Sequence, residues 1–149
     1  MFIDLDRFKA LNDRHGHVVG DQALAQIAHR LEDAAGERGR VARYAGDEFC
    51  VAVHDPGDIE AVAAAVQVAM AASFSLDTGS VRISASVGSA RSTPGDTARD
   101  LVHCADQAMY RAKSGAVPPS DDDPTPSAPS PQNPAVGSGA GPCDASPPG

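Results

Sequence analysis

The sequence predicts an α/β sandwich, a sheet with helices covering one of its faces. Segments with the helical spacing of apolar residues alternate along the chain with short runs in which every second residue is apolar. The chain has 149 residues, 42% of them hydrophobic, and no apolar run approaches the roughly 18 residues of a membrane span. An acid as early as Asp4 argues against a signal peptide. A soluble, cytoplasmic domain is therefore expected.

The first third of the chain predicts a strand and two helices. The strand is expected over residues 1–5, and Asp6 is expected to cap a helix of about two turns that stops at Gly16. A second helix is expected after residues 20–21 and ends at Gly36. Its apolar face consists of Leu24, Ile27, Ala28, Leu31 and Ala35.

A β-hairpin and a third helix are expected in the middle of the chain. Strand-like runs at residues 41–44 and 49–53 flank the string Ala45-Gly46-Asp47-Glu48, which places the acids at an exposed turn. The break at Pro56-Gly57 is followed by a helical period over residues 59–70.

The last part of the domain predicts one more strand and one more helix. Apolar residues alternate over residues 81–87, which is typical of a half-buried strand. Thr97 with Asp100 resembles a capping box. The face of the helix that follows is formed by Leu101, Ala105, Ala108, Met109 and Ala112.

The C-terminal segment has the composition of a disordered tail. Residues 114–149 contain no Leu, Ile, Phe, Met, Tyr, Lys or Arg, but 10 of the 12 prolines. The folded domain is therefore expected over residues 1–117 and the tail over residues 118–149. The formal net charge of −8 argues against sequence-independent binding of nucleic acid or anionic lipid, which needs a surplus of Lys and Arg. No nucleic-acid or membrane partner is expected.

Two acidic pairs are far apart in the sequence but occupy similar places. Asp4 and Asp6 lie at the end of the first strand, and Asp47 and Glu48 lie at the hairpin turn. If these strands are neighbours, the carboxylates converge, and grouped carboxylates suit Mg²⁺ and phosphoryl transfer. Acids at strand ends and turns can equally be solvated, and Asp6 fits a helix N-cap better than a metal ligand. The spacing alone does not decide between these interpretations.

Five ordered strings resemble one known family. These are Phe2-Ile3-Asp4-Leu5-Asp6-Arg7-Phe8-Lys9-Ala10-Leu11-Asn12-Asp13, Gly16-His17 with Gly20-Asp21, Arg43-Tyr44-Ala45-Gly46-Asp47-Glu48-Phe49, Ser84-Ala85-Ser86-Val87-Gly88, and Ala105-Asp106-Gln107-Ala108-Met109-Tyr110-Arg111-Ala112-Lys113. Together they are similar to the GGDEF domain of diguanylate cyclases. The resemblance implies a palm-like nucleotide-cyclase fold, with a mostly antiparallel sheet flanked by helices and the signature on a β-hairpin. It also implies that a homodimer condenses two GTP to cyclic di-GMP and pyrophosphate.

The resemblance carries roles to individual positions. Asp4, Asp47 and Glu48, with the carbonyl of Leu5, would bind Mg²⁺ or Mn²⁺, and Asp47 and Glu48 would be catalytic. Glu48 would bind metal or deprotonate the attacking 3′-hydroxyl. The residues that would bind GTP are Arg7 and Phe8 through their amides, Lys9 and Lys113 at the phosphates, and Asn12 and Asp21 at the guanine edge. Lys113 could instead simply complement the helix dipole.

Four departures from the family pattern are visible. The family's opening Asp-x-Leu-Thr-Gly-Leu-x-Asn-Arg string has no counterpart. Either the domain is truncated and lacks its opening helix, which would expose apolar residues of the sheet, or its start is assigned too late. Ala45 replaces the first signature glycine, which would cost about 1 kcal/mol of stability if that position needs a positive φ. No arginine follows Lys113 in the last helix, and Gly36 and Gly39 stand where a product-inhibition site would need Arg and Asp. The alternative to a cyclase is therefore a weak or inactive module that binds GTP or a protein partner.

Overall fold

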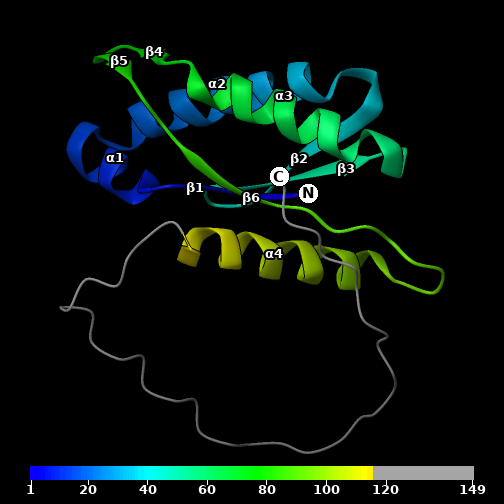
Figure 1. Cartoon of the computed structure of the whole chain (residues 1–149). Helices are drawn as coiled ribbons and strands as arrows, with labels where there is room; N and C mark the ends of the chain where they lie inside the picture. Colours follow the sequence, from blue (N-terminus) through cyan, green and yellow to red (C-terminus); the bar gives the residue numbers. More distant parts are fainter. Residues whose placement is uncertain (116–149) are drawn as a thin grey trace, which may run out of the picture.

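The computed structural model describes residues 1–115, so the predicted tail lies outside the described residues. No helix in this part is both long and apolar enough to cross a membrane. The elements, shown in Figure 1, are β1 (Phe2–Leu5), α1 (Phe8–His15), α2 (His17–Ala35), the 3-10 helix η1 (Gly36–Arg38), β2 (Gly39–Ala45), β3 (Glu48–Val53), the 3-10 helix η2 (Pro56–Asp58), α3 (Ile59–Ala71), β4 (Phe74–Leu76), β5 (Gly79–Val81), β6 (Ala85–Gly88) and α4 (Ala98–Gly115).

The centre of the molecule is a four-stranded antiparallel sheet with the strand order β2-β3-β1-β6. The short strands β4 and β5 form a separate hairpin. Helices α1, α2 and α3 lie on one side of the sheet, and α4 crosses the opposite side alone (Figure 1). The flanked antiparallel sheet is as expected, but the expectation that helices cover only one face is wrong.

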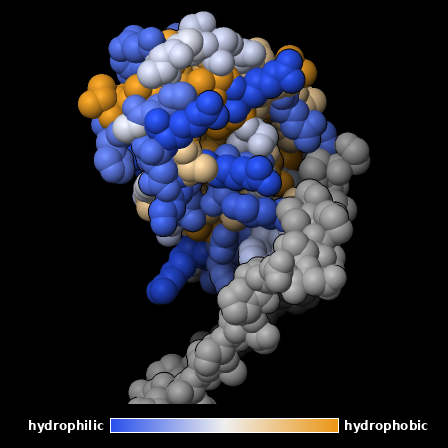
Figure 2. Space-filling model, turned by 90° about the vertical axis from the view of Figure 1, so that its left-hand side faces the viewer, coloured by the Kyte–Doolittle hydropathy of each residue, from blue (hydrophilic) through white to orange (hydrophobic). Residues whose placement is uncertain are grey.

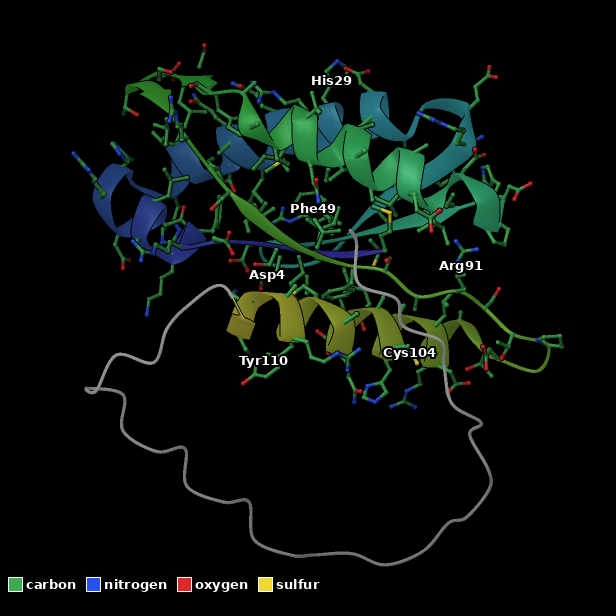
Figure 3. The ribbon with its side chains drawn as sticks, viewed as in Figure 1. Asp4, His29, Phe49, Arg91, Cys104 and Tyr110 are labelled. Atoms are coloured by element: carbon green, nitrogen blue, oxygen red, sulfur yellow. The ribbon has the colours of Figure 1, made fainter. Side chains whose placement is uncertain are left out.

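Strand alternation divides the core between the two faces of the sheet. On the face of α2 and α3, Ile3, Phe49 and Val51 belong to the larger core cluster and are almost completely buried. Phe49 points into this helical layer in Figure 3. On the face of α4, Phe2 belongs to a smaller cluster with Met109. Because Asp4 has the same parity as Phe2, its carboxylate is directed to the face of α4.

Two local predictions differ from the structure, and one short strand was not predicted. The second helix begins at His17, four residues before Asp21, so that only Gly16 separates it from α1. The strand expected over residues 81–87 is interrupted at residues 82–84, where the chain passes from the β4–β5 hairpin to the main sheet. Strand β4 was not predicted from the sequence. The periods of the remaining elements and the hairpin are confirmed.

One part of the α4 face carries little cover. The register pairs Ala42 with Cys50 and Arg40 with Ala52, which places these side chains on the α4 side of β2 and β3. Arg40, Ala42 and Ala52 are exposed. Tyr44 is 60% exposed, and its ring centre lies 5.3 Å from that of Phe2 in an edge-on arrangement. The strip therefore mixes a charged, an aromatic and several small side chains.

Candidate active site

The carboxylates singled out in the sequence meet at one corner of the sheet. Strand β1 pairs with β3 so that Asp4 lies opposite Glu48. One residue further along, the amide of Leu5 donates to the carbonyl of Asp47 at 3.2 Å. The hairpin turn is held by Arg43, whose Nε donates to the carbonyl of Gly46 at 2.8 Å. The predicted juxtaposition of the first strand with the hairpin acids is thus present.

Helix α4 adds a cation to this corner. The Nζ of Lys113 forms an ion pair with Oδ1 of Asp4, whose side chain is only 18% exposed. In Figure 3, Asp4 lies between the sheet and the C-terminal part of α4. The hydrogen bond to Asp4 raises the pKa of Lys113. Desolvation opposes this rise, and the charges of Asp4, Asp6 and Asp47 each add a smaller increase. Lys113 therefore does more than complement the helix dipole, because it neutralises a specific carboxylate.

Glu48 lies close to three other carboxylates. Its pKa is raised, first by desolvation and then by the charges of Asp4, Asp47 and Asp106, against which Lys113 acts more weakly. Asp106 was not singled out in the sequence, although it lies seven residues before Lys113 and therefore on the same helix face. A carboxylate with a raised pKa is a better proton acceptor when it is ionised.

This corner offers the donors of a cation site, although not a completed one. Within residues 1–115, no group of three or more His, Cys, Asp or Glu side chains is arranged to hold a metal ion. Asp4, Asp47 and Glu48 supply hard oxygen atoms of the kind that Mg²⁺ prefers. The pKa of Glu48 is raised first by desolvation and then by neighbouring negative charges, and a bound cation would oppose the effect of those charges. The residues fit a divalent cation on condition that Lys113 leaves Asp4.

The turn between β1 and α1 takes an unusual backbone conformation. Arg7 has φ 57° and ψ 27°, and no other non-glycine residue in the described part has a positive φ. The prediction that Asp6 caps α1 is wrong, because Arg7 occupies the N-cap without a side-chain hydrogen bond. The carboxylate of Asp6 instead accepts a hydrogen bond from Ser86 Oγ at 2.8 Å. The backbone amide of Asp6 donates to the carbonyl of Ser84 at 2.9 Å. This bent turn leaves the amides of the first turn of α1 without helical partners.

The predicted phosphate-binding residues on α1 are placed differently from one another. The side chain of Phe8 is buried in the core, so only its backbone is free to bind. Lys9 is exposed on the first turn and makes no hydrogen bond or ion pair within the described residues. Figure 2 looks onto the end of the molecule that bears α1 and the β4–β5 hairpin, where most of the surface is hydrophilic.

The two residues predicted to read guanine lie where α1 meets α2. Asn12 is half-buried on α1, and Asp21 is exposed on α2. The Oδ1 atom of Asn12 is buried and has no hydrogen-bond partner, the only such side-chain atom found in the described part. The side chain of Asp21 likewise makes no hydrogen bond or ion pair among the described residues. Both side chains therefore retain free hydrogen-bonding capacity.

A pocket of about 280 Å³ lies beside α1, on the side of the β5–β6 connection. It shares Arg7 and Phe8 with the predicted site, and Arg14 and Arg82 also line it. None of the predicted metal or guanine residues lines this pocket. The pocket therefore overlaps the predicted GTP site only at residues 7 and 8.

The substitution of Ala45 in the signature introduces no backbone strain. The positive φ in the turn belongs to Gly46, at 48°, and Ala45 ends strand β2 with a negative φ. Gly36 and Gly39 lie on η1 and at the start of β2, where neither can supply the side chain that a product-inhibition site would use.

Comparisons with known proteins agree with this arrangement. The model of the family described as diguanylate cyclase, GGDEF domain, matches residues 1–116. The chain belongs to the GGDEF family. An uncharacterized 19.3 kDa protein from Streptomyces ambofaciens is 40% identical over 115 residues, which cover 76% of this chain and 62% of that protein. Diguanylate cyclase TpbB from Pseudomonas aeruginosa is 41% identical over 121 residues, covering 78% of this chain and 28% of that protein.

The same resemblance is present in three dimensions. The crystal structure of the GGDEF domain of TpbB from Pseudomonas aeruginosa superimposes with a TM-score of 0.71 and 41% sequence identity. The match covers 77% of this chain and 74% of that one. The chain spans less than two thirds of the length of the curated relatives described above. The antiparallel sheet flanked by helices is thus the fold of a GGDEF domain.

Proposed function

We propose that this domain is a diguanylate cyclase, which condenses two GTP into cyclic di-GMP with release of pyrophosphate for bacterial second-messenger signalling. The observation that carries the proposal is the convergence of Asp4, Asp47, Glu48 and Lys113 at one corner of the sheet. GGDEF cyclases are generally metal-dependent. The family and the diguanylate cyclases among its relatives support the same reaction.

The chemistry requires a 3′-hydroxyl oxygen to attack the α-phosphorus of a second nucleotide. The bond between that phosphorus and the oxygen of the β-phosphate breaks, and pyrophosphate leaves. The same step with the other 3′-hydroxyl closes the ring and releases a second pyrophosphate. Mg²⁺, or Mn²⁺ in its place, would be held by Asp4, Asp47, Glu48 and the carbonyl of Leu5, and when bound it neutralises the charge of the triphosphate. Glu48 accepts the proton of the hydroxyl, a role for which its raised pKa is suited.

The remaining residues bind and orient the nucleotide. Lys113 moves from Asp4 to the phosphates, which the amides of Arg7 and Phe8 and the side chain of Lys9 also contact. Asn12 and Asp21 pair with the guanine edge, and adenine would leave these groups unpaired. GGDEF domains bind GTP and act as dimers. Two domains would place their half-sites face to face, because one site holds one GTP.

The test is incubation of the purified chain with Mg²⁺ and GTP, followed by chromatographic analysis of the nucleotides. Cyclic di-GMP is expected from the parent and from Asp33→Asn, a matched change of an exposed acid on α2. Asp47→Asn should abolish the product. Formation of equal product by Asp47→Asn would contradict the assigned site.

A second candidate function is a module that binds GTP without turnover. The absence of an arginine after Lys113 favours it, because the phosphates lose one ligand of the family pattern. GTP binding by the parent without cyclic di-GMP, at protein concentrations that allow dimers, would support this alternative.

A further inference from the structure

Gly20 lies at the crossing of α1 and α2, directly under the side chain of Asn12. A Cβ atom at this position would lie 1.8 Å from Oδ1 of Asn12, 3.0 Å from its Cγ and 3.4 Å from Cζ of Phe8. The first distance is far inside any van der Waals contact. The amide of Asn12 therefore occupies the space that any other residue at position 20 would fill.

The backbone does not explain a glycine here. Gly20 lies inside α2 and does not have a positive φ. Glycine is disfavoured in a helix interior relative to alanine, so its presence costs helix stability. What the glycine provides is space, since Gly20 is itself buried and the Oδ1 of Asn12 is buried against it without a hydrogen-bond partner.

We propose that Gly20 is a positioning residue that sets the amide of Asn12 for base recognition and thereby determines the preference for guanine over adenine. This inference rests on the proposed function, because it takes the base to be that of GTP. A methyl group at position 20 would push the Asn12 amide out by about 1.5 Å before ordinary contact is restored. Hydrogen bonds tolerate only a few tenths of an ångström around their preferred length, so the displaced amide would lose the base.

The first experiment is a double-mutant cycle on stability, with Gly20→Ala, Asn12→Ala and the combined variant. Gly20→Ala should lower the urea midpoint of the parent, since the methyl and the amide cannot share one space. In the Asn12→Ala background the same change should be neutral or stabilising, because the space is then empty and alanine favours the helix. Equal effects of Gly20→Ala in both backgrounds would overturn the proposed contact.

The second experiment measures the affinities for GTP and ATP by calorimetry in the presence of Mg²⁺. Gly20→Ala should bind GTP at least tenfold more weakly than the parent and discriminate against ATP no better than Asn12→Ala does. The combined variant, which relieves the clash, should have the same affinities for GTP and ATP as Asn12→Ala. It also controls for a loss of folding in Gly20→Ala. Gly57→Ala adds a methyl group beside the Asp55 carboxylate at 3.2 Å and should leave both affinities unchanged.

The outcomes separate the two proposals. If Gly20→Ala is folded and keeps the GTP affinity and selectivity of the parent, Gly20 does not position Asn12 for the base. If the parent itself does not bind GTP while the stability cycle shows strong coupling, the proposed function fails and with it the role of Gly20 in guanine selection. The packing of Asn12 on Gly20 would then be structural only.

Discussion

Gly88 is the position at which the structure predicts the largest effect of a single added methyl group. It ends strand β6 under helix α4, and a Cβ there would lie 2.1 Å from the carbonyl oxygen of Ala105 and 2.1 Å from the amide nitrogen of Met109. The Cα of Met109 would be 2.7 Å away. All three are backbone atoms, so no side-chain rotation relieves the overlap. Gly88→Ala must therefore displace α4 from the sheet.

The magnitude follows from the packing that α4 loses. Met109 and Ala105 are 5% and 3% exposed and form the smaller core cluster with Phe2, so lifting α4 opens contacts along this whole face. Overpacking of a core generally costs about 1–3 kcal/mol, and overlap with rigid backbone belongs at the upper end. The reduced freedom of the unfolded chain returns about 0.4–1 kcal/mol. We expect a net loss of about 2–2.5 kcal/mol in the free energy of unfolding.

Equilibrium urea unfolding at 25 °C, followed by far-ultraviolet circular dichroism, measures this loss. Gly57→Ala is the matched control, because its methyl would meet only the flexible carboxylate of Asp55. Hydrogen exchange of the α4 amides should accelerate in Gly88→Ala and not in the control. A midpoint for Gly88→Ala within error of the parent would refute the close approach of β6 and α4.

Three further perturbations have outcomes set by particular contacts. Thr97→Ala should lower the melting temperature by about 4 °C, because it removes the capping box with Asp100. The hydrogen bonds from Thr97 lower the pKa of Asp100 in the folded state. The difference in melting temperature should therefore be full at pH 7 and shrink below about pH 4, where Asp100 becomes protonated. Arg30→Met should lower the free energy of unfolding, measured in urea, by about 1–2 kcal/mol. The reason is that the guanidinium donates to three carbonyls at the end of α3 and just after it. Lys113→Gln should raise the Mg²⁺ affinity of the nucleotide-free domain several-fold in calorimetry, because the ammonium no longer competes for Asp4, and a lower Mg²⁺ affinity would contradict this.

The helices of this fold could be predicted because their burial follows a local period. Ile27 and Leu31 on α2, and Val62 and Val66 on α3, are fully buried at the expected spacing. The capping box at the start of α4 was equally readable, since both partners lie within one helical turn. Local signals of this kind need no knowledge of the rest of the chain.

Periodicity reports which way side chains face, but not which strand they pair with. The alternation from Val81 to Val87 continues through the break, and Ile83 remains 5% exposed although its neighbours leave the ladder. The chain therefore changes its pairing partner from β4 to β1 without a change in pattern. One predicted strand became two because pairing is decided by distant segments.

The turn after β1 shows the same limit at the site. Asp6 is a residue type that often caps helices, yet its carboxylate accepts a hydrogen bond from Ser86, 80 residues away in sequence. Arg7 then occupies the cap in a left-handed conformation that costs about 1–2 kcal/mol in isolation and is held here by the flanking strand and helix. A tertiary hydrogen bond thus overrides the local preference.

The pairing of Asp4 with Lys113 links the fold of α4 to the chemistry of the corner. Grouped carboxylates repel one another, and the lysine at the end of α4 offsets this repulsion while no other cation is present. A divalent cation that binds Asp4 must displace the ammonium, which then becomes available for the phosphate groups that arrive with the metal. The metal ion takes the place of the ammonium group at Asp4, and the ammonium group then contacts the phosphates. Each ligand should therefore increase the affinity of the domain for the other. The close approach of Gly88 to residues 105 and 109 fixes the helix that carries this lysine, so packing further along α4, on the same face of the sheet, bears on the site.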